Sequence, residues 1–190
     1  AIKGNNSITF QDVVVGDVWV ASGQSNMEFK LNTVMNSETE IAAANFPKIR
    51  LFTVEQNVSA YPLDDVKARV WQACTPATAA GFSAVAYFFG RDLQQKLNVP
   101  IGLIHSSWGG TPAEAWTSMP ALGADAALMP VFAEWGKMAR DVASGLRQQE
   151  IERREAAKAR AEGREAKVVP WRPNARLSWS PAGLYNAMIA

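Results

Sequence analysis

One apolar segment of this chain ends in a serine that a folded sheet would expose at its rim. Residues 17–22 predict a strand that runs directly into Gly23, Gln24, Ser25 and Asn26. Gly23 permits a sharp turn, and the N–H groups that begin a following helix point toward negative charge developing beside Ser25. The pattern indicates a nucleophilic serine. Serine and asparagine are also common helix caps, so a structural role is the alternative.

A second apolar segment ends in a similar turn. Residues 101–107 predict a buried strand, and Gly109 and Gly110 follow it with backbone donors that no side chain obstructs. Residues 49–54 predict a further strand and residues 81–97 a helix, which gives the order β-α-β-α-β. The chain is therefore expected to form an α/β fold with a parallel sheet. In the flavodoxin-like strand order 2-1-3, the first and third strands are neighbours and bring the serine beside the glycine turn.

Four segments of the sequence carry a resemblance to a known family. They are Val18–Glu28, Phe82–Arg91, Ser107–Trp116 and Pro181–Ile189. These segments resemble the N-terminal part of the catalytic domain of the sialate O-acetylesterase family, the carbohydrate acetylesterase branch of the SGNH hydrolases. The resemblance implies a three-layer α/β/α sheet that is incomplete in this chain. It also implies a serine esterase that removes O-acetyl groups from sialic acid or acetylated polysaccharide through an acetyl-enzyme, without a metal or an organic cofactor.

The same resemblance assigns roles to the residues of the two turns. It places the nucleophile on Ser25 and the glycine block of the oxyanion hole on Gly109 and Gly110, with Gly110 preferred. The backbone N–H groups of Ser25 and Gly110 would then stabilise the oxyanion that forms when the serine attacks the acetyl carbonyl.

Neighbouring residues are expected to support this site. Gln24 and Asn26 are interpreted as braces of the nucleophile loop, and Trp108 as an aromatic wall for a sugar. Glu114 either bonds to neighbouring backbone or places its charge in the first turn of a helix.

His105 is the only histidine in the chain. In the family that the motifs resemble, the catalytic histidine comes from an Asp-x-x-His segment far toward the C-terminus, and this sequence contains no such segment. Two interpretations of His105 stay open: it is the base, or it orients the glycine turn by hydrogen bonding. The second is favoured, because a histidine inside an apolar strand is more often a hydrogen-bonded core residue.

The chain is therefore interpreted as part of a longer catalytic domain. Residues 1–190 are expected to form the N-terminal part of one esterase domain, with the remainder on a second polypeptide that carries the catalytic histidine and aspartate, or otherwise missing. The absence of an initiator methionine and the apolar run at the C-terminal end favour this interpretation. A catalytically silent sugar-binding or assembly domain with the same fold is the alternative function.

A charged helical insertion is predicted at about residues 131–167. Trp135, Met138, Val142 and Leu146 recur at helical spacing, and a dense mixture of Arg, Lys and Glu follows them. A helix that docks at its start and projects into solvent at its end is favoured, and a lid or assembly arm is the alternative. Residues 169–174 are expected to break the helix and to offer an exposed site for proteolytic cutting.

Composition narrows the choice of partners. The net charge of +1 argues against a nucleic-acid partner, and no apolar run is long enough for a membrane span. Cys74 is the single cysteine, which predicts a buried structural thiol. The sequence has no His/Cys cluster that would indicate a metal site. The resemblance implies an acetylated carbohydrate substrate and a secreted or periplasmic location.

Overall fold

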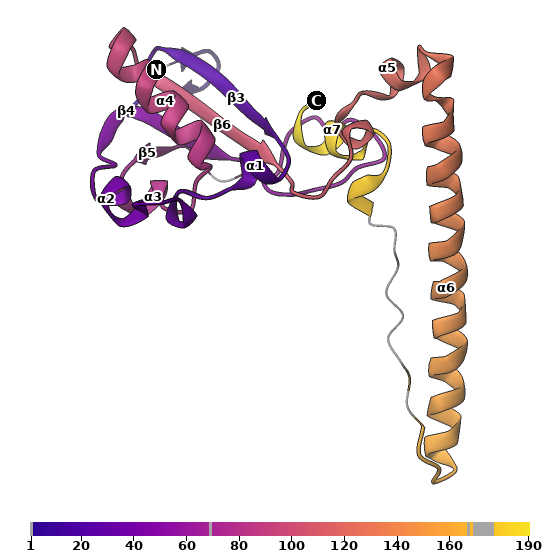
Figure 1. The fold of residues 1–190 in the computed structure, drawn as a ribbon. Coiled ribbons are helices and arrows are strands. Elements are labelled where there is room, and N and C mark those ends of the chain that lie inside the picture. The colour runs from indigo at the N-terminus through magenta and orange to yellow at the C-terminus, as the bar shows by residue number, and fades with distance from the viewer. Residues whose placement is uncertain (1, 69, 167, 169–176) are drawn as a thin grey trace. The chain divides into compact units, whose positions relative to one another are not determined.

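The computed structural model describes residues 2–68, 70–166, 168 and 177–190. The chain forms two compact units, one of residues 1–56 and 66–110 and the other of residues 57–65 and 111–190. Figure 1 shows the elements of both. The helix break and cutting site predicted at residues 169–174 lie outside the described residues.

The first unit is built on a four-stranded sheet in the order β3-β6-β4-β5. Its strands are β3 (Asp17–Gly23), β6 (Ile101–Ser107), β4 (Phe46–Thr53) and β5 (Gln72–Cys74). The three long strands are parallel, as predicted, and the short β5 pairs antiparallel with β4. A separate antiparallel pair, β1 (Ile2–Lys3) and β2 (Ser7–Ile8), precedes this sheet.

The strand order corrects one detail of the prediction. The first and third predicted strands are neighbours, but the central strand of the three is β6 and not β3, so the order 2-1-3 is wrong. The difference lies in burial: Ile101 and Leu103 of β6 are almost fully buried, whereas Val18 and Val20 of β3 are each 61% exposed. Both strands are equally apolar in sequence, so composition does not distinguish the central strand from the edge strand.

The helices of the first unit connect and flank these strands. They are α1 (Ser25–Glu28), η1 (Leu31–Thr33), α2 (Ser37–Ala42), α3 (Pro76–Ala79) and α4 (Ala84–Leu97). Helix α4 starts three residues later than predicted because the Ser83 hydroxyl accepts a hydrogen bond from the Ala86 N–H and caps it. Its last residue is Leu97, and the following residue, Asn98, adopts the left-handed conformation and caps the helix.

Helix α4 packs on one face of the sheet and forms the core there. Ile49, Leu51, Tyr87, Ile101 and Leu103 are buried together between α4, β4 and β6. Among the described residues, the opposite face has no comparable cluster: Val18 and Val20 on β3 are exposed, and so is Trp71, which directly precedes β5. The sheet therefore has a helical layer on one face, which fits the predicted incomplete three-layer fold.

The second unit consists of helices. They are η2 (Ala113–Trp116), α5 (Met119–Gly123), η3 (Ala126–Leu128), α6 (Met129–Ala161), η4 (Leu177–Trp179) and α7 (Gly183–Met188). Within this unit α7 holds the segment of residues 57–65: the Ser59 N–H donates to the Gly183 carbonyl at 3.0 Å, and the Asn186 side-chain amide donates to the Ser59 carbonyl at 3.3 Å.

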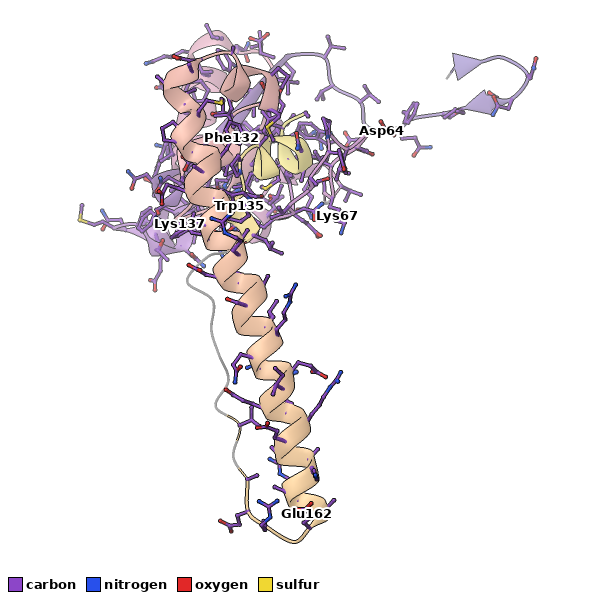
Figure 2. All side chains as sticks on the ribbon, turned by 90° about the vertical axis from the view of Figure 1, so that its right-hand side faces the viewer. Asp64, Lys67, Phe132, Trp135, Lys137 and Glu162 are labelled. Carbon is purple, nitrogen blue, oxygen red and sulfur yellow. The ribbon has the colours of Figure 1, made fainter. Side chains whose placement is uncertain are left out.

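The predicted long helix is present as α6, whose 33 residues span about 50 Å. Figure 2 shows Phe132 and Trp135 near its start and Glu162 just beyond its end. Trp135, Met138 and Val142 are half-buried and Leu146 is 54% exposed, whereas Ala156 and Ala159 near the end of the helix are buried. The helix is therefore covered at both ends, which corrects the prediction that its end projects into solvent. Arg154 pairs with Glu150 on the second half of the helix. Within the described part of the chain, no helix combines the length and apolar character that crossing a membrane requires.

Gly90 of α4 lies directly against the buried Leu103. An added Cβ would lie 2.6 Å from Leu103 Cδ1, whereas a Cβ on Gly136 of α6 would meet nothing closer than an arginine nitrogen at 4.0 Å. We therefore expect Gly90→Ala to lower the free energy of unfolding by about 1–3 kcal/mol through overpacking. Gly136→Ala is the matched control and should stabilise its helix by up to about 1 kcal/mol. Urea denaturation measures both, and equal effects would contradict this account of the close approach.

Candidate active site

Ser25 lies immediately beyond the carboxyl end of β3. Gly23 has φ of +146°, and the chain turns there into α1, a single helical turn that Ser25 begins. The Gln24 carbonyl accepts the Glu28 N–H at 2.9 Å and so braces this turn through the backbone. Ser25 and Asn26 are both exposed. The predicted nucleophile therefore stands at the rim of the sheet, accessible to a ligand.

The structure brings the glycine turn beside Ser25, as predicted. Gly23 is paired with Ser107 in the β3–β6 register, and the Trp108 N–H donates to the Gly23 carbonyl at 3.1 Å. A Cβ on Gly109 would lie 3.2 Å from Ser25 Oγ, so only glycine leaves the hydroxyl unobstructed there. Gly110 has φ of +73°, and nothing lies within 4 Å of its Cβ position. The space beside this turn is open.

Glu28 is a member of the site that the sequence analysis missed. Its Oε2 accepts the Gly109 N–H at 2.5 Å, and its Oε1 accepts from Gln56 Nε2 at 2.8 Å. The signal that could have found it is its position three residues after Ser25, because residues three apart share one face of a helical turn. The Gly109 N–H is therefore directed to this carboxylate.

His105 is buried behind the turn, with 8% of its surface exposed. Its Nε2 lies 2.6 Å from Ser107 Oγ, and the ring also hydrogen-bonds the Met27 backbone. Burial lowers the pKa of His105 below its ordinary value of 6.5, whereas the negative charge of Glu28 and the bond to Met27 act in the opposite direction. The ring is buried and hydrogen-bonded to Ser107 and to the Met27 backbone, which favours a supporting role over that of a base for Ser25.

The remaining predicted residues fall in different places. Trp108 is half-buried at the turn and contributes the backbone bond to Gly23. Glu114 belongs to the second unit, where it lies in the first turn of η2 and its carbonyl accepts the Ala182 N–H at 2.9 Å. The acidic side chain therefore lies at a helix start, as one of the two alternatives predicted, whereas the bond to Ala182 is made by the Glu114 backbone and not by its side chain.

A cavity of about 760 Å³ opens at the carboxyl ends of β4 and β6. Glu28, Gln56, His105 and Ser107 line it, together with Lys30, Thr53, Glu55, Gln72, Thr78 and Phe82. Carboxylate, amide and hydroxyl groups share this lining with apolar side chains such as Leu51, Val54 and Phe82, so the cavity offers both hydrogen-bonding groups and apolar surface to a ligand. The position also agrees with the general rule that open α/β sheets bind ligands at the carboxyl ends of their strands.

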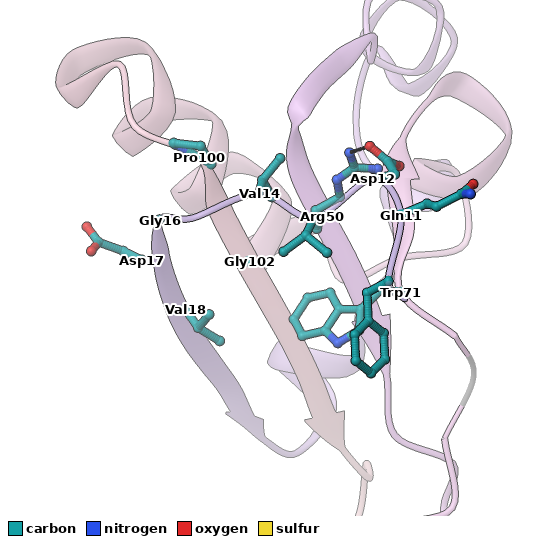
Figure 3. Close-up of a pocket in the computed structure, with 12 residues that line it drawn as sticks. Gln11, Asp12, Val14, Gly16, Asp17, Val18, Arg50, Trp71, Pro100 and Gly102 are labelled. Carbon is teal, nitrogen blue, oxygen red and sulfur yellow. Dashed lines mark hydrogen bonds and ion pairs between the residues drawn. The ribbon is translucent and has the colours of Figure 1, made fainter. Parts of the chain in front are cut away.

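A second cavity, of about 390 Å³, lies at the opposite end of β3 (Figure 3). The segment of residues 10–16 covers it, and Arg50 pairs with Asp12 beside it at 2.7 Å. Trp71 contributes an aromatic wall. Because this cavity lies at the amino ends of β3 and β6, away from the serine turn, we do not assign the site to it.

The single cysteine is buried, as predicted. Burial raises the pKa of Cys74 to about 11, which keeps the thiol protonated and unreactive at neutral pH. Among the residues that the structure describes, no group of three or more histidine, cysteine or acidic side chains could hold a metal ion.

Comparison with known proteins agrees with this geometry. A family model described as a carbohydrate esterase, sialic acid-specific acetylesterase, matches residues 15–141. The chain belongs to this family. The match includes Ser25, Glu28 and the glycine turn, and it ends within the first half of α6. The family is one of carbohydrate esterases.

Individual relatives extend the comparison. The sialate O-acetylesterases of Pongo abelii and Homo sapiens are each 39% identical to this chain over 130 residues, which is 64% of this chain and 25% of theirs. A carbohydrate acetylesterase from Xanthomonas citri superposes with a TM-score of 0.63 at 30% identity, over 92% of this chain and 28% of its own. This esterase-family chain therefore spans about a quarter of the length of these relatives.

The buried His105 makes stability depend on pH. Its folded pKa is below 6.5, so the unfolded chain takes up a proton first as pH falls. The stability that the neutral His105 contributes to the folded protein is fully present above pH 6.5, and it is lost as pH falls toward the lower pKa of the folded state. We expect the free energy of unfolding to decrease between about pH 7 and 5.5, and this slope to be smaller in His105→Asn. Urea denaturation at several pH values in this range measures the slope, and identical slopes in the two proteins would refute the attribution of the pH dependence to His105.

Proposed function

We propose that this chain carries the nucleophilic half of a serine carbohydrate esterase that removes O-acetyl groups from sugars. The observation that carries the proposal is the juxtaposition of Ser25 with the Gly109–Gly110 turn at the carboxyl ends of two parallel strands. A nucleophile beside backbone donors is the minimum arrangement for acyl transfer. O-Acetylated sialic acid and acetylated polysaccharide are the proposed substrates, and the cavity beside Glu28 is the proposed place for their hydroxyl groups.

The reaction would proceed in two steps. The Ser25 oxygen attacks the acetyl carbonyl, and the N–H groups of Ser25 and Gly110 stabilise the resulting oxyanion. Collapse of this intermediate breaks the bond to the sugar oxygen, which leaves with a proton as the free alcohol. Water then attacks the acetyl-enzyme, passes through a second oxyanion, and releases acetate and the regenerated serine.

The base for these steps would come from residues outside this chain. His105 is buried and hydrogen-bonded to Ser107 and to the Met27 backbone, and the chain spans about a quarter of the length of its relatives. We propose that the catalytic histidine and aspartate lie on a second polypeptide, or on a further part of the protein, in a secreted or periplasmic setting. The exposed Val18 and Val20 on the edge strand β3 would be covered by that part.

The first test is Ser25→Ala in the intact protein with every native chain present. Acetate release from O-acetylated sialic acid and from acetylated xylan should fall by at least about 10³-fold, because no other group can form the acetyl-enzyme. Ser7→Ala is the matched control: Ser7 is exposed on β2, and its removal should leave activity unchanged.

Two results would overturn the proposal. Full activity in Ser25→Ala would exclude the serine mechanism. Saturable binding of the acetylated sugar with no acetate release by the complete unmodified protein would identify a silent sugar-binding domain. Native mass spectrometry of the same sample shows whether a second polypeptide accompanies the chain.

A further inference from the structure

A single carboxylate joins the ends of three strands at the candidate site. Glu28 follows β3 on the α1 turn, Gln56 follows β4, and Gly109 follows β6. Glu28 Oε2 accepts the Gly109 N–H at 2.5 Å, and Glu28 Oε1 accepts from Gln56 Nε2 at 2.8 Å. The Gln56 amide also lies 3.4 Å from the Ser107 carbonyl. The two carboxylate oxygens thus tie the nucleophile turn after β3 to the segments that follow β4 and β6.

The glycine turn needs an external partner of this kind. Two successive glycines have the widest choice of backbone conformation, and neither has a side chain that could pack and hold the turn. The Gly109 peptide is therefore oriented by what its N–H binds. A hydrogen bond to an ionised carboxylate is shorter and stronger than one between neutral groups, so Glu28 is well suited to hold it.

We propose that Glu28 is a positioning residue that fixes the Gly109 peptide and thereby directs the Gly110 N–H toward the oxyanion formed at Ser25. The inference rests on the proposed function, because it assigns Glu28 a task within the same reaction. Glu28 is not the base: its two oxygens accept hydrogen bonds from Gly109 and Gln56, and its effect on the reaction passes through the backbone of the turn.

Two conservative variants separate the geometry of Glu28 from its charge. Glu28→Gln keeps the length and one carbonyl acceptor for Gly109, and the Gln56 amide can rotate to offer its oxygen to the new amide group. Glu28→Asp keeps the charge but shortens the side chain by about 1.5 Å, so it cannot bind Gly109 and Gln56 together. The positioning role predicts that the length of the side chain at position 28 affects the rate more than its charge does.

We expect kcat for acetate release to fall by about 10- to 100-fold in Glu28→Asp, because a donor displaced by about 1 Å loses most of its effect. KM should change by less than about threefold, since the oxyanion exists only after attack. Glu28→Gln should keep kcat within about threefold of the unmodified protein. The proposal is overturned if Glu28→Asp is fully active or if Glu28→Gln loses as much as Glu28→Asp.

Glu38 offers the matched control. It is an exposed glutamate in the first turn of α2, and it does not line the cavity beside Glu28. Glu38→Gln and Glu38→Asp should therefore leave kcat and KM unchanged. Loss of kcat in either control would mean that the protein's surface charge, and not the Glu28 contact, governs the rate.

Two spectroscopic measurements do not depend on turnover. The Gly109 amide proton should resonate downfield in the unmodified protein and move upfield in Glu28→Asp, as expected when a charge-assisted bond is lost. The pKa of His105 should fall in Glu28→Gln, which removes a negative charge that raises it, and change less in Glu28→Asp. An unchanged Gly109 resonance in Glu28→Asp would refute the contact.

These readouts also separate this inference from the proposed function. If Ser25→Ala retains acetate release while the Gly109 and His105 signals respond as described, the esterase mechanism fails and the structural contact stands, without its catalytic task. If Ser25→Ala is inactive and Glu28→Asp is not impaired, the mechanism stands and the positioning role of Glu28 fails.

Discussion

The parallel pairing of β3 with β6 is the interaction on which the candidate site depends. Seven residue pairs in continuous register bring the carboxyl ends of the two strands to the same edge of the sheet. The bond from the Trp108 N–H to the Gly23 carbonyl extends this ladder into the turns themselves. Ser25 and Gly109 are 84 positions apart in sequence, and they meet because each directly follows one of these strands.

The core beneath the sheet gives this edge its rigidity. Leu103 is fully buried against Gly90 of α4, and the absence of a side chain on Gly90 lets helix and strand approach closely. His105 continues the same strand toward the site and stays largely buried, with Phe82 packed edge-on against its ring at a centroid distance of 5.4 Å. The polar contacts of the site therefore rest on a close-packed apolar layer, where small displacements are resisted.

The long helix of the second unit is stabilised differently from the sheet of the first unit. The buried residues of α6 are two alanines near its end, Ala156 and Ala159, so its helical state depends mainly on its alanine-rich composition and on pairs such as Arg154 with Glu150. By contrast, α7 and residues 57–65 are joined by specific backbone bonds across a large separation in sequence.

The sequence by itself determined the features that depend on neighbouring residues. Apolar runs marked the three parallel strands, helical spacing marked α4 and α6, and strand-end glycines marked Ser25 and the Gly109–Gly110 turn. It did not determine which strand is central, because β3 and β6 are equally apolar and only their burial differs. Nor did it identify Gly109 and Gln56 as partners of Glu28, or Met27 as a partner of His105, because these partners come from segments far away in sequence. Such contacts are set by the packing of whole strands, and a local pattern carries no information about which distant segment becomes the neighbour.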